Sequence, residues 1–280
     1  MKAFSLFSGI GGFDLALKRN GVEIVGACEI DKYARSVYGK HFPGVKIWEN
    51  ATTINPKEIP DHDIFCAGFP CQAFSIAGKR RGFNDTRGTL FFEIQRIVKE
   101  KQPSILLLEN VLGLLSHDKG QTFATILDTL DALRFDVEWQ VLNSKNFGVA
   151  QNRERVFIVG HSRGKRTRKI FPLGGDYTKM DESQKETVVL VYTSQVNQNM
   201  KQRVQNRTNT WTLGTTPQRD FMIIDPKTGR GRRPTPLECE RLQGFPDNWT
   251  EGHADTQRYK MCGNAVTVPV VEYLVQELLR

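Results

Sequence analysis

Hydrophobic positions follow two alternating patterns over the first 161 residues of the chain. Short apolar runs typical of buried strands occur at residues 3–8, 22–29, 62–67, 104–109, 137–143 and 155–161. Longer segments with apolar residues at helical spacing lie between them, at residues 13–20, 31–42, 89–101 and 121–134. This alternation predicts an α/β domain in which a parallel sheet is covered by helices.

The pattern changes after this domain. Residues 161–233 are rich in Gln, Asn and Thr, with short β-like runs at 187–193 and 221–224, and we expect a small, irregular, partly β domain there. Order returns with a helix that begins at Pro236, and the chain ends in an apolar helix over 266–279. Because no helix precedes the first strand, one flank of the sheet would stay bare unless the last helix returns to cover it. The large domain would then be discontinuous.

Positive charge is concentrated in one quarter of the chain. Residues 160–233 hold 15 of the 39 Lys and Arg residues but only 6 of the 31 Asp and Glu residues. Such segregation favours a surface that binds a polyanion. No apolar run approaches the roughly 20 residues that span a bilayer, and the N-terminal apolar run is too short for a secretory signal. We therefore expect a cytoplasmic protein without a membrane partner.

One cysteine stands where covalent chemistry is plausible. The apolar run 62–67 leads into Gly68-Phe69-Pro70-Cys71-Gln72, and Pro70 prevents the strand from continuing. Cys71 is expected just past the carboxyl end of a strand, where ligands bind in open α/β sheets. Its thiolate would be a strong carbon nucleophile, although a small apolar residue in a turn explains Cys71 alone equally well. The five cysteines include no Cys-x-x-Cys pair, which argues against a disulfide framework or a structural zinc site.

A glycine turn after the first strand predicts a cofactor site. In Phe7-Ser8-Gly9-Ile10-Gly11-Gly12, the glycines let a ligand approach the backbone beside a helix N-terminus. Glu29, 20 residues after Gly9, ends the second strand, where a carboxylate accepts hydrogen bonds from ribose hydroxyls. A dinucleotide fingerprint would have a third glycine where Asp14 stands, so the pattern indicates a nucleoside-bearing cofactor and disfavours NAD.

Six motifs follow one another along nearly the whole chain. They are Phe7-Ser8-Gly9-Ile10-Gly11-Gly12, Gly68-Phe69-Pro70-Cys71-Gln72, Glu109-Asn110-Val111, Gln151-Asn152-Arg153-Glu154-Arg155, Arg241-Leu242-Gln243-Gly244-Phe245-Pro246-Asp247 and Gly263-Asn264-Ala265-Val266. Together they resemble the DNA (cytosine-5)-methyltransferases of the compact bacterial and phage type that accompanies restriction systems. The resemblance implies an α/β, Rossmann-like S-adenosylmethionine-dependent methyltransferase fold. It also implies a catalytic domain of residues 1–164 plus 233–280 and a small, partly β target-recognition domain of residues 165–232.

The activity that the resemblance implies is methyl transfer from S-adenosylmethionine to C5 of a cytosine flipped out of duplex DNA. Cys71 would add to C6 of the ring, which breaks its aromaticity and makes C5 reactive. Glu109 would donate to N3 or hold the N3 proton and the exocyclic amine. Arg153 and Arg155, which alternate on a strand, would steady the base at O2 and orient Glu109 and the cysteine loop.

For the cofactor, the resemblance implies that Phe7 and Ile30 contact the two faces of the adenine and that Glu29 binds the ribose. Asn50 stands where the family commonly has an aspartate that reaches the adenine amino group, a bond that an amide oxygen can also accept. Asn264 and Val266 would close the pocket. No metal is expected, and the implied cofactor-binding residues are Phe7, Ser8, Gly9, Ile10, Gly11, Gly12, Glu29, Ile30, Asn50, Ala51, Pro70, Leu90, Asn264 and Val266.

Two sets of residues are expected to contact DNA. Basic residues in the glycine-bounded loop after the cysteine would meet phosphates as the loop closes, and Gln72 and Ser75 would fill the space that the flipped base leaves. In the basic segment, Thr212-Leu213 resembles a dipeptide that recurs in the family's recognition domains, and Arg and Gln side chains read base edges or bind phosphates. The candidates are Gln72, Ser75, Lys79, Arg80, Arg81, Arg87, Arg203, Arg207, Trp211, Thr212, Leu213, Gln218 and Arg219.

Two alternatives stay open at this point. A tRNA cytosine-5 methyltransferase shares the catalytic motifs, although the long basic segment favours DNA. A catalytically dead DNA-binding regulator would be expected to lack Cys71 or Glu109, and this chain retains both. We expect a monomer that binds double-stranded DNA, because a flipped base needs only one catalytic pocket. A role in restriction-modification or phage protection fits, with a cognate restriction endonuclease acting separately.

Overall fold

A computed structural model describes residues 1–69, 90–165, 167–173, 191–192, 210–211, 222–224 and 231–280. The chain divides into two compact units. Unit 1 consists of Met1–Leu142, Arg155–Gly174 and Val271–Arg280, and unit 2 consists of Asn143–Glu154 and Gly175–Val270.

These units differ from the predicted domains in the placement of residues 233–270. The sequence assigned them to the catalytic domain, whereas they group with unit 2. The reason is local packing, because helices α5 (Pro236–Leu242) and α6 (Asp255–Asn264) pack together, and hydrogen bonds join this region to Gln151 and Arg153. The functional division into catalytic and recognition domains stays a prediction.

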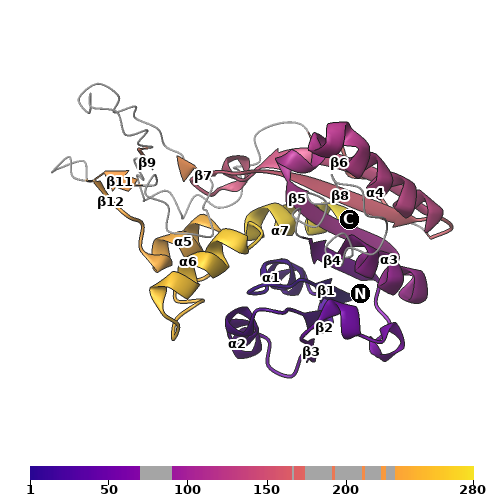
Figure 1. The fold of residues 1–280 in the computed structure, drawn as a ribbon, viewed down its shortest axis with the longest axis horizontal. Helices are drawn as coiled ribbons and strands as arrows, with labels where there is room; N and C mark the ends of the chain where they lie inside the picture. Colours follow the sequence, from indigo (N-terminus) through magenta and orange to yellow (C-terminus); the bar gives the residue numbers. More distant parts are fainter. Residues whose placement is uncertain (70–89, 166, 174–190, 193–209, 212–221, 225–230) are drawn as a thin grey trace. The chain divides into compact units, whose positions relative to one another are not determined.

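Within the described residues, unit 1 is built on a seven-stranded sheet in the order β3-β2-β1-β4-β5-β8-β6 (Figure 1). Its strands are β1 (Lys2–Leu6), β2 (Glu23–Cys28), β3 (Ile47–Trp48), β4 (Ile64–Gly68), β5 (Ile105–Val111), β6 (Phe135–Asn143) and β8 (Glu154–Ser162). The first five in spatial order pair in parallel. All six predicted strands are present, and the short β3 was not predicted.

The expectation of an entirely parallel sheet is wrong at β8, which runs antiparallel to β5. A parallel neighbour needs a crossover of a dozen or more residues, usually a helix. The connection from β6 to β8 holds only the short 3₁₀ helix η6 (Ser144–Phe147) and strand β7 (Gln151–Asn152). This short connection between β6 and β8 therefore favours an antiparallel turn over a helical crossover.

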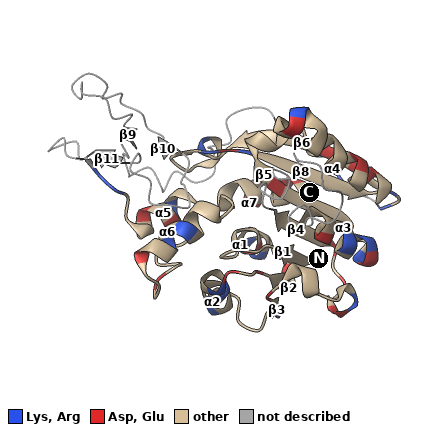
Figure 2. Ribbon diagram, viewed as in Figure 1, with Lys and Arg blue, Asp and Glu red and all other residues tan. Residues whose placement is uncertain are grey.

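Helices cover both faces of this sheet. Apolar residues of α3 (Leu90–Lys101) and α4 (Gln121–Ala132) share one buried core with strand residues such as Phe65 and Leu106. Figure 2 shows that both helices also carry charged residues. Residues of the opposite face, Ser5 and Cys66, lie close to Asp14 of α1 (Gly12–Arg19). The remaining helices of unit 1 are α2 (Lys32–His41), η1 (Ala51–Thr53), η2 (Pro56–Glu58), η4 (Leu112–Leu115) and η5 (His117–Gly120).

The C-terminal segment Val271–Arg280 also belongs to unit 1 and forms most of helix α7 (Val268–Leu279). An ion pair of 3.1 Å between Arg19 Nη1 and Glu272 Oε2 places it beside α1. The sequence predicted that the last helix returns to one flank of the sheet, without specifying which flank.

The described part of unit 2 combines short strands with helices that include α5 and α6. Strand β7 pairs in parallel with β10 (Thr210–Trp211), and β9 (Val191–Tyr192), β11 (Met222–Ile224) and β12 (Gly231–Arg232) form an antiparallel sheet. Helix α5 begins as predicted at Pro236, behind a capping box in which Thr235 and Glu238 satisfy each other's backbone N–H groups. Helix α6 was not predicted, because its sequence lacks a clear apolar stripe.

Helix α1 carries the carboxyl group of Asp14 into the core, where it is fully buried. Burial raises the pKa of Asp14 to about 7, although the hydroxyl groups of Tyr38 and Ser5 beside it oppose the shift. The carboxyl therefore binds a proton more tightly in the folded chain than in the unfolded one. The free energy of unfolding should fall as pH rises from about 4 to about 7, because ionisation opposes folding across that window.

We expect Asp14→Asn to remove this dependence. Relative to the variant, wild type should lose about 2 kcal/mol of stability between pH 5 and pH 8. Urea unfolding at the two pH values measures the difference. Asp128→Asn, which removes an exposed carboxylate from α4, controls for the loss of one negative charge. A stability difference between wild type and Asp14→Asn that is the same at both pH values would contradict the expectation.

Candidate active site

The carboxyl ends of four parallel strands meet at one edge of the unit 1 sheet. Strand β1 has β2 on one side and β4 on the other, so the strand order reverses at β1. Ligands of open α/β sheets bind in the crevice at such a reversal. The predicted glycine turn follows β1, Glu29 follows β2, and Glu109 lies near the end of β5. The topology therefore brings the predicted cofactor and catalytic residues of unit 1 to the same edge.

The glycine turn is joined to Glu29 by direct hydrogen bonds. The backbone N–H groups of Gly9 and Asp31 donate to Glu29 Oε2 and Oε1, each at 2.8 Å. Gly9 has a positive φ of 56°, and a side chain at this position would meet no atom within 4 Å. The buried Ser8 Oγ has no hydrogen-bond partner within the described part of the chain. An open cradle with an available hydroxyl and a fixed carboxylate fits the ribose of a nucleoside.

The loop after β2 presents Ile30 to solvent, with 72% of its surface exposed. Arg35 Nη1 donates to the backbone oxygens of Glu29 and Ile30, at 3.0 and 2.7 Å. These bonds hold the loop in place, and an exposed apolar side chain on a fixed loop suits the face of an adenine ring. Sequence reasoning missed Arg35, because nothing in the pattern of helix α2 distinguishes it from a surface arginine.

Asn50 and Ala51 lie at the start of η1. Asn50 Oδ1 accepts hydrogen bonds from the backbone N and Oγ1 of Thr52, both at 3.0 Å, and so caps this helix. The oxygen expected to reach an adenine amino group is thus already engaged locally. Ala51 is buried, and its backbone oxygen accepts a bond of 2.9 Å from Arg96 Nη2. Leu90, the last unit 1 cofactor candidate that the structure describes, is half-buried at the first position of α3.

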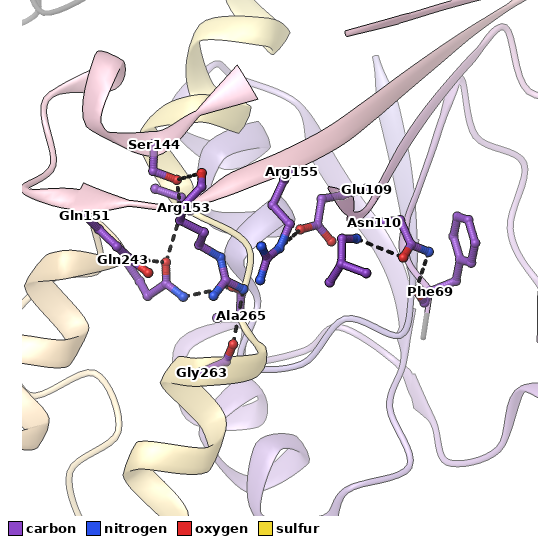
Figure 3. Close-up of polar contacts among 12 residues, drawn as sticks. Phe69, Glu109, Asn110, Ser144, Gln151, Arg153, Arg155, Gln243, Gly263 and Ala265 are labelled. Carbon is purple, nitrogen blue, oxygen red and sulfur yellow. Dashed lines mark hydrogen bonds and ion pairs between the residues drawn. The ribbon is translucent and has the colours of Figure 1, made fainter. Parts of the chain in front are cut away.

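Glu109 and Arg155 form an ion pair at the edge of the sheet (Figure 3). Glu109 lies opposite Gly68 in the parallel β4–β5 register, and its Oε1 lies 3.1 Å from Arg155 Nε. Both side chains are largely buried, with 12% and 15% of their surface exposed. Burial lowers the pKa of Arg155, and the negative charge of Glu109 opposes that shift. The ion pair with Arg155 therefore fixes the orientation of the Glu109 carboxyl group, and the catalytic roles of both residues stay predictions.

Asn110 fixes the backbone that leads to the predicted nucleophile. Its Nδ2 donates 2.8 Å to the backbone oxygen of Phe69, and its Oδ1 accepts from the N–H of Val111 (Figure 3). Phe69 is buried against Phe91 of α3. The chain is therefore held two residues before Cys71 by the neighbour of Glu109. The sequence contained Asn110 within a motif but gave no physical reason to assign it a role.

Cys71 itself lies outside the described residues. So do these other candidates: Pro70, Gln72, Ser75, Lys79, Arg80, Arg81, Arg87, Arg203, Arg207, Thr212, Leu213, Gln218 and Arg219, together with the side chain of Trp211. The other four cysteines, Cys28, Cys66, Cys239 and Cys262, are described, and all are buried free thiols. Burial raises the pKa of each, to about 12 for Cys28 and Cys239. None of these four is suited to act as a thiolate nucleophile.

Arg153 lies in unit 2 and contacts backbone atoms. Its Nη2 donates to the oxygens of Gly263 and Ala265, at 3.1 and 3.0 Å (Figure 3). The predicted cofactor residue Asn264, which is exposed, stands between these two buried residues, and Val266 is buried. Arg153 and Arg155 were expected to share a role at the base, but the described contacts differ: Arg155 pairs with Glu109 and Arg153 holds a turn.

Comparison with known proteins assigns this arrangement to a family. A family model of C-5 cytosine-specific DNA methylases matches residues 1–213 and 174–280. The chain belongs to the C-5 cytosine-specific DNA methylase family. Its predicted family and enzyme class are thus confirmed, and the protein is a DNA (cytosine-5)-methyltransferase. Methylases of this family depend on S-adenosylmethionine, in agreement with the nucleoside cradle of unit 1.

Bacterial Type II methyltransferases are among the relatives of this C-5 cytosine-specific DNA methylase. It is 40% identical over 308 residues to Type II methyltransferase M1.ScrFI of Lactococcus lactis subsp. cremoris, which covers 99% of this chain and 78% of the relative. It is 35% identical over 308 residues to Type II methyltransferase M.HhaI of Haemophilus parahaemolyticus, with 99% and 94% covered.

Solved structures agree with the fold of this methylase. A mutant of Spodoptera frugiperda DNMT2 matches with a TM-score of 0.75 at 21% identity, over 100% of this chain and 99% of that chain. Dnmt2 methyltransferase of S. pombe matches with a TM-score of 0.75 at 18% identity, over 100% and 98%. At these identities the likeness supports the fold alone, and the predicted methyltransferase fold class is confirmed. No helix in the part of the methylase that the structure describes is long and apolar enough to cross a bilayer.

Proposed function

We propose that this methyltransferase modifies cytosine at a specific site in duplex DNA through a transient bond between Cys71 and C6 of a flipped base. The observation that carries the proposal is the Glu109–Arg155 pair at the carboxyl edge of the sheet. It lies opposite Gly68, on the strand that leads to Cys71, and Asn110 holds that connection at Phe69. A nucleophile and a carboxyl group delivered by adjacent strands are suited to act on one ring.

Each residue in this proposal has a chemical task. The thiolate of Cys71 adds to C6, and the electrons move toward N3 and O2. Glu109 stabilises that charge by donating a proton to N3 or by holding an N3 proton already present. Arg155 keeps the carboxyl group oriented. Addition makes C5 an enamine-like carbon, and after methylation the loss of the C5 proton and of the sulfur restores the aromatic ring.

S-adenosylmethionine supplies an electrophilic methyl group when it is bound. We assign the ribose to Glu29, whose carboxylate is held by Gly9 and Asp31. The adenine contacts go to Phe7, Ile30 and Asn50. The complete proposed set remains Phe7, Ser8, Gly9, Ile10, Gly11, Gly12, Glu29, Ile30, Asn50, Ala51, Pro70, Leu90, Asn264 and Val266.

Recognition of the DNA site is proposed for residues 165–232, because 13 Lys and Arg against 6 Asp and Glu give this segment most of the chain's net charge of +8, and because it lies outside the shared motifs. Residues 72–87 would contact the phosphates and fill the gap in the duplex. We further propose that the protein acts as a monomer in a bacterial cytoplasm, within a restriction-modification system or as phage protection. Curated relatives named as Type II methyltransferases support this setting.

A covalent trap tests the proposal. Duplex DNA with 5-fluorocytosine at the target should form an adduct with the protein that survives denaturing electrophoresis and requires S-adenosylmethionine, because fluorine at C5 cannot leave as a proton does. Bisulfite sequencing of DNA from cells that express the chain first identifies the target. Methyl transfer to tRNA and not to DNA would replace this proposal with the tRNA alternative. DNA binding without any methyl transfer would favour the regulator.

A further inference from the structure

A buried polar network in unit 2 holds the last turn of helix α6 and its C-cap residue, Ala265. Arg153 Nη2 donates to the backbone oxygens of Gly263 and Ala265, and Gln243 Nε2 donates to those of Cys262 and Ala265 at 2.6 and 2.9 Å (Figure 3). Three positions around Asn264, residues 262, 263 and 265, are thus held by side chains that come from other parts of the sequence.

The donors of this network are themselves held in place. Gln243 Oε1 accepts from Gln151 Nε2 at 3.1 Å and from Thr267 Oγ1 at 2.9 Å, and Ser144 Oγ lies 2.8 Å from Thr267 Oγ1. Gln151, Gln243, Thr267 and Ser144 are all buried. A buried network of hydrogen-bonded polar groups favours one conformation, because another arrangement would leave these polar atoms without their present partners.

The charge of Arg153 suits its position. The last backbone oxygens of a helix have no partner within the helix, and a cation is favoured at that end by the helix dipole. The guanidinium group of Arg153 supplies charge-assisted bonds there and is only 3% exposed. Its withdrawal toward a substrate would leave the oxygens of Gly263 and Ala265 without this donor. Asn264, between them, is exposed to solvent.

We infer that Arg153 is a positioning residue that acts through Asn264 on the cofactor, and not a contact of the flipped cytosine. The inference rests on the proposed function, which assigns Asn264 to S-adenosylmethionine. It separates the two arginines of one motif: Arg155 serves the step at the base through Glu109, and Arg153 serves cofactor affinity through the fixed turn.

Arg153→Lys and Arg155→Lys form the matched pair that tests this division. Each keeps a positive charge but loses the planar fork of donors. Arg153→Lys should raise the dissociation constant for S-adenosylhomocysteine, measured by titration calorimetry, by roughly tenfold, and leave kcat at saturating cofactor within about twofold. Arg155→Lys should lower kcat by about tenfold or more and leave that dissociation constant unchanged.

A double-mutant cycle distinguishes positioning from a general structural role. If Arg153 acts through Asn264, then Arg153→Lys should change the dissociation constant by less than about twofold in an Asn264→Ala background. Thr267→Val, which removes the hydroxyl bonds to Gln243 and Ser144 with little change in shape, is the second variant should Arg153→Lys fail to fold. It should raise the dissociation constant about threefold without lowering kcat.

Three results overturn the inference: a lower kcat with unchanged cofactor affinity in Arg153→Lys, fully additive effects of Arg153→Lys and Asn264→Ala, or no effect of Thr267→Val on affinity. Failure of the proposed function gives a different result, because wild type itself would then bind no S-adenosylhomocysteine or form no adduct with 5-fluorocytosine DNA.

Discussion

Replacing Cys71 with serine is expected to lower the methylation rate at saturating DNA and cofactor by at least about a thousandfold. A hydroxyl group at neutral pH is a far weaker nucleophile toward C6 than a thiolate, and no other described cysteine can replace it, because burial raises the pKa of all four. Transfer of tritiated methyl groups to duplex DNA measures the rate. The adduct with 5-fluorocytosine DNA should disappear in the same variant, whereas binding of S-adenosylhomocysteine should persist.

Cys66→Ala is the matched control. Cys66 stands five residues earlier, fully buried within β4, with a thiol whose pKa burial raises well above its usual value. Its replacement should lower the free energy of unfolding by about 1 kcal/mol through lost packing and leave the rate per folded molecule nearly unchanged. Methylation by Cys71→Ser at the wild-type rate would refute the covalent mechanism. A large rate loss in Cys66→Ala alone would indicate that the essential thiol lies in β4 and is not that of Cys71.

The central sheet was accessible from sequence because its strands are buried on both faces. Runs such as Ile105–Leu108 are continuously apolar and bounded by polar residues, which leaves little choice of element. The direction of β8 was missed, because an apolar strand looks the same in either orientation and the information lay in the short connection from β6. Helix α6 was not predicted because it buries few residues, and the sequence around Met261 shows no apolar stripe at helical spacing.

The residues of the candidate site also fall into those that could be predicted from the sequence and those that could not. Glu29, which follows β2, could be proposed from its position in the chain, and Glu109 on β5 from the resemblance to the family. Residues that act through a contact distant in sequence could not. Asn110 reaches back to Phe69, and Arg153 reaches forward to Ala265. No pattern of neighbouring residues predicts such pairs. The sequence therefore identified Asn110 and Arg153 as parts of motifs, and their contacts are known only from the structure.

Glu109→Gln is expected to lower kcat by about a hundredfold to a thousandfold, because the amide can neither deliver a proton to N3 nor carry the negative charge that holds one. The loss should appear in kcat and not in cofactor affinity, since the hydrogen bonds that fix Glu29, the residue proposed to bind the ribose, do not involve Glu109. Adduct formation with 5-fluorocytosine DNA should slow by a similar factor, because Glu109 assists the addition of the thiolate itself.

The control for Glu109→Gln is Glu138→Gln in strand β6. Glu138 is a carboxylate of similar burial, since 11% of its side-chain surface is exposed against 12% for Glu109. It also has a similar contact: Glu138 Oε1 lies 2.9 Å from His161 Nε2, and Glu109 Oε1 lies 3.1 Å from Arg155 Nε. Both variants remove a charge from a buried pair and should destabilise the fold. Only Glu109→Gln should lower kcat when rates are corrected for the folded fraction. Equal rate losses in both variants would show that the carboxyl group of Glu109 supports the fold and not the reaction at N3.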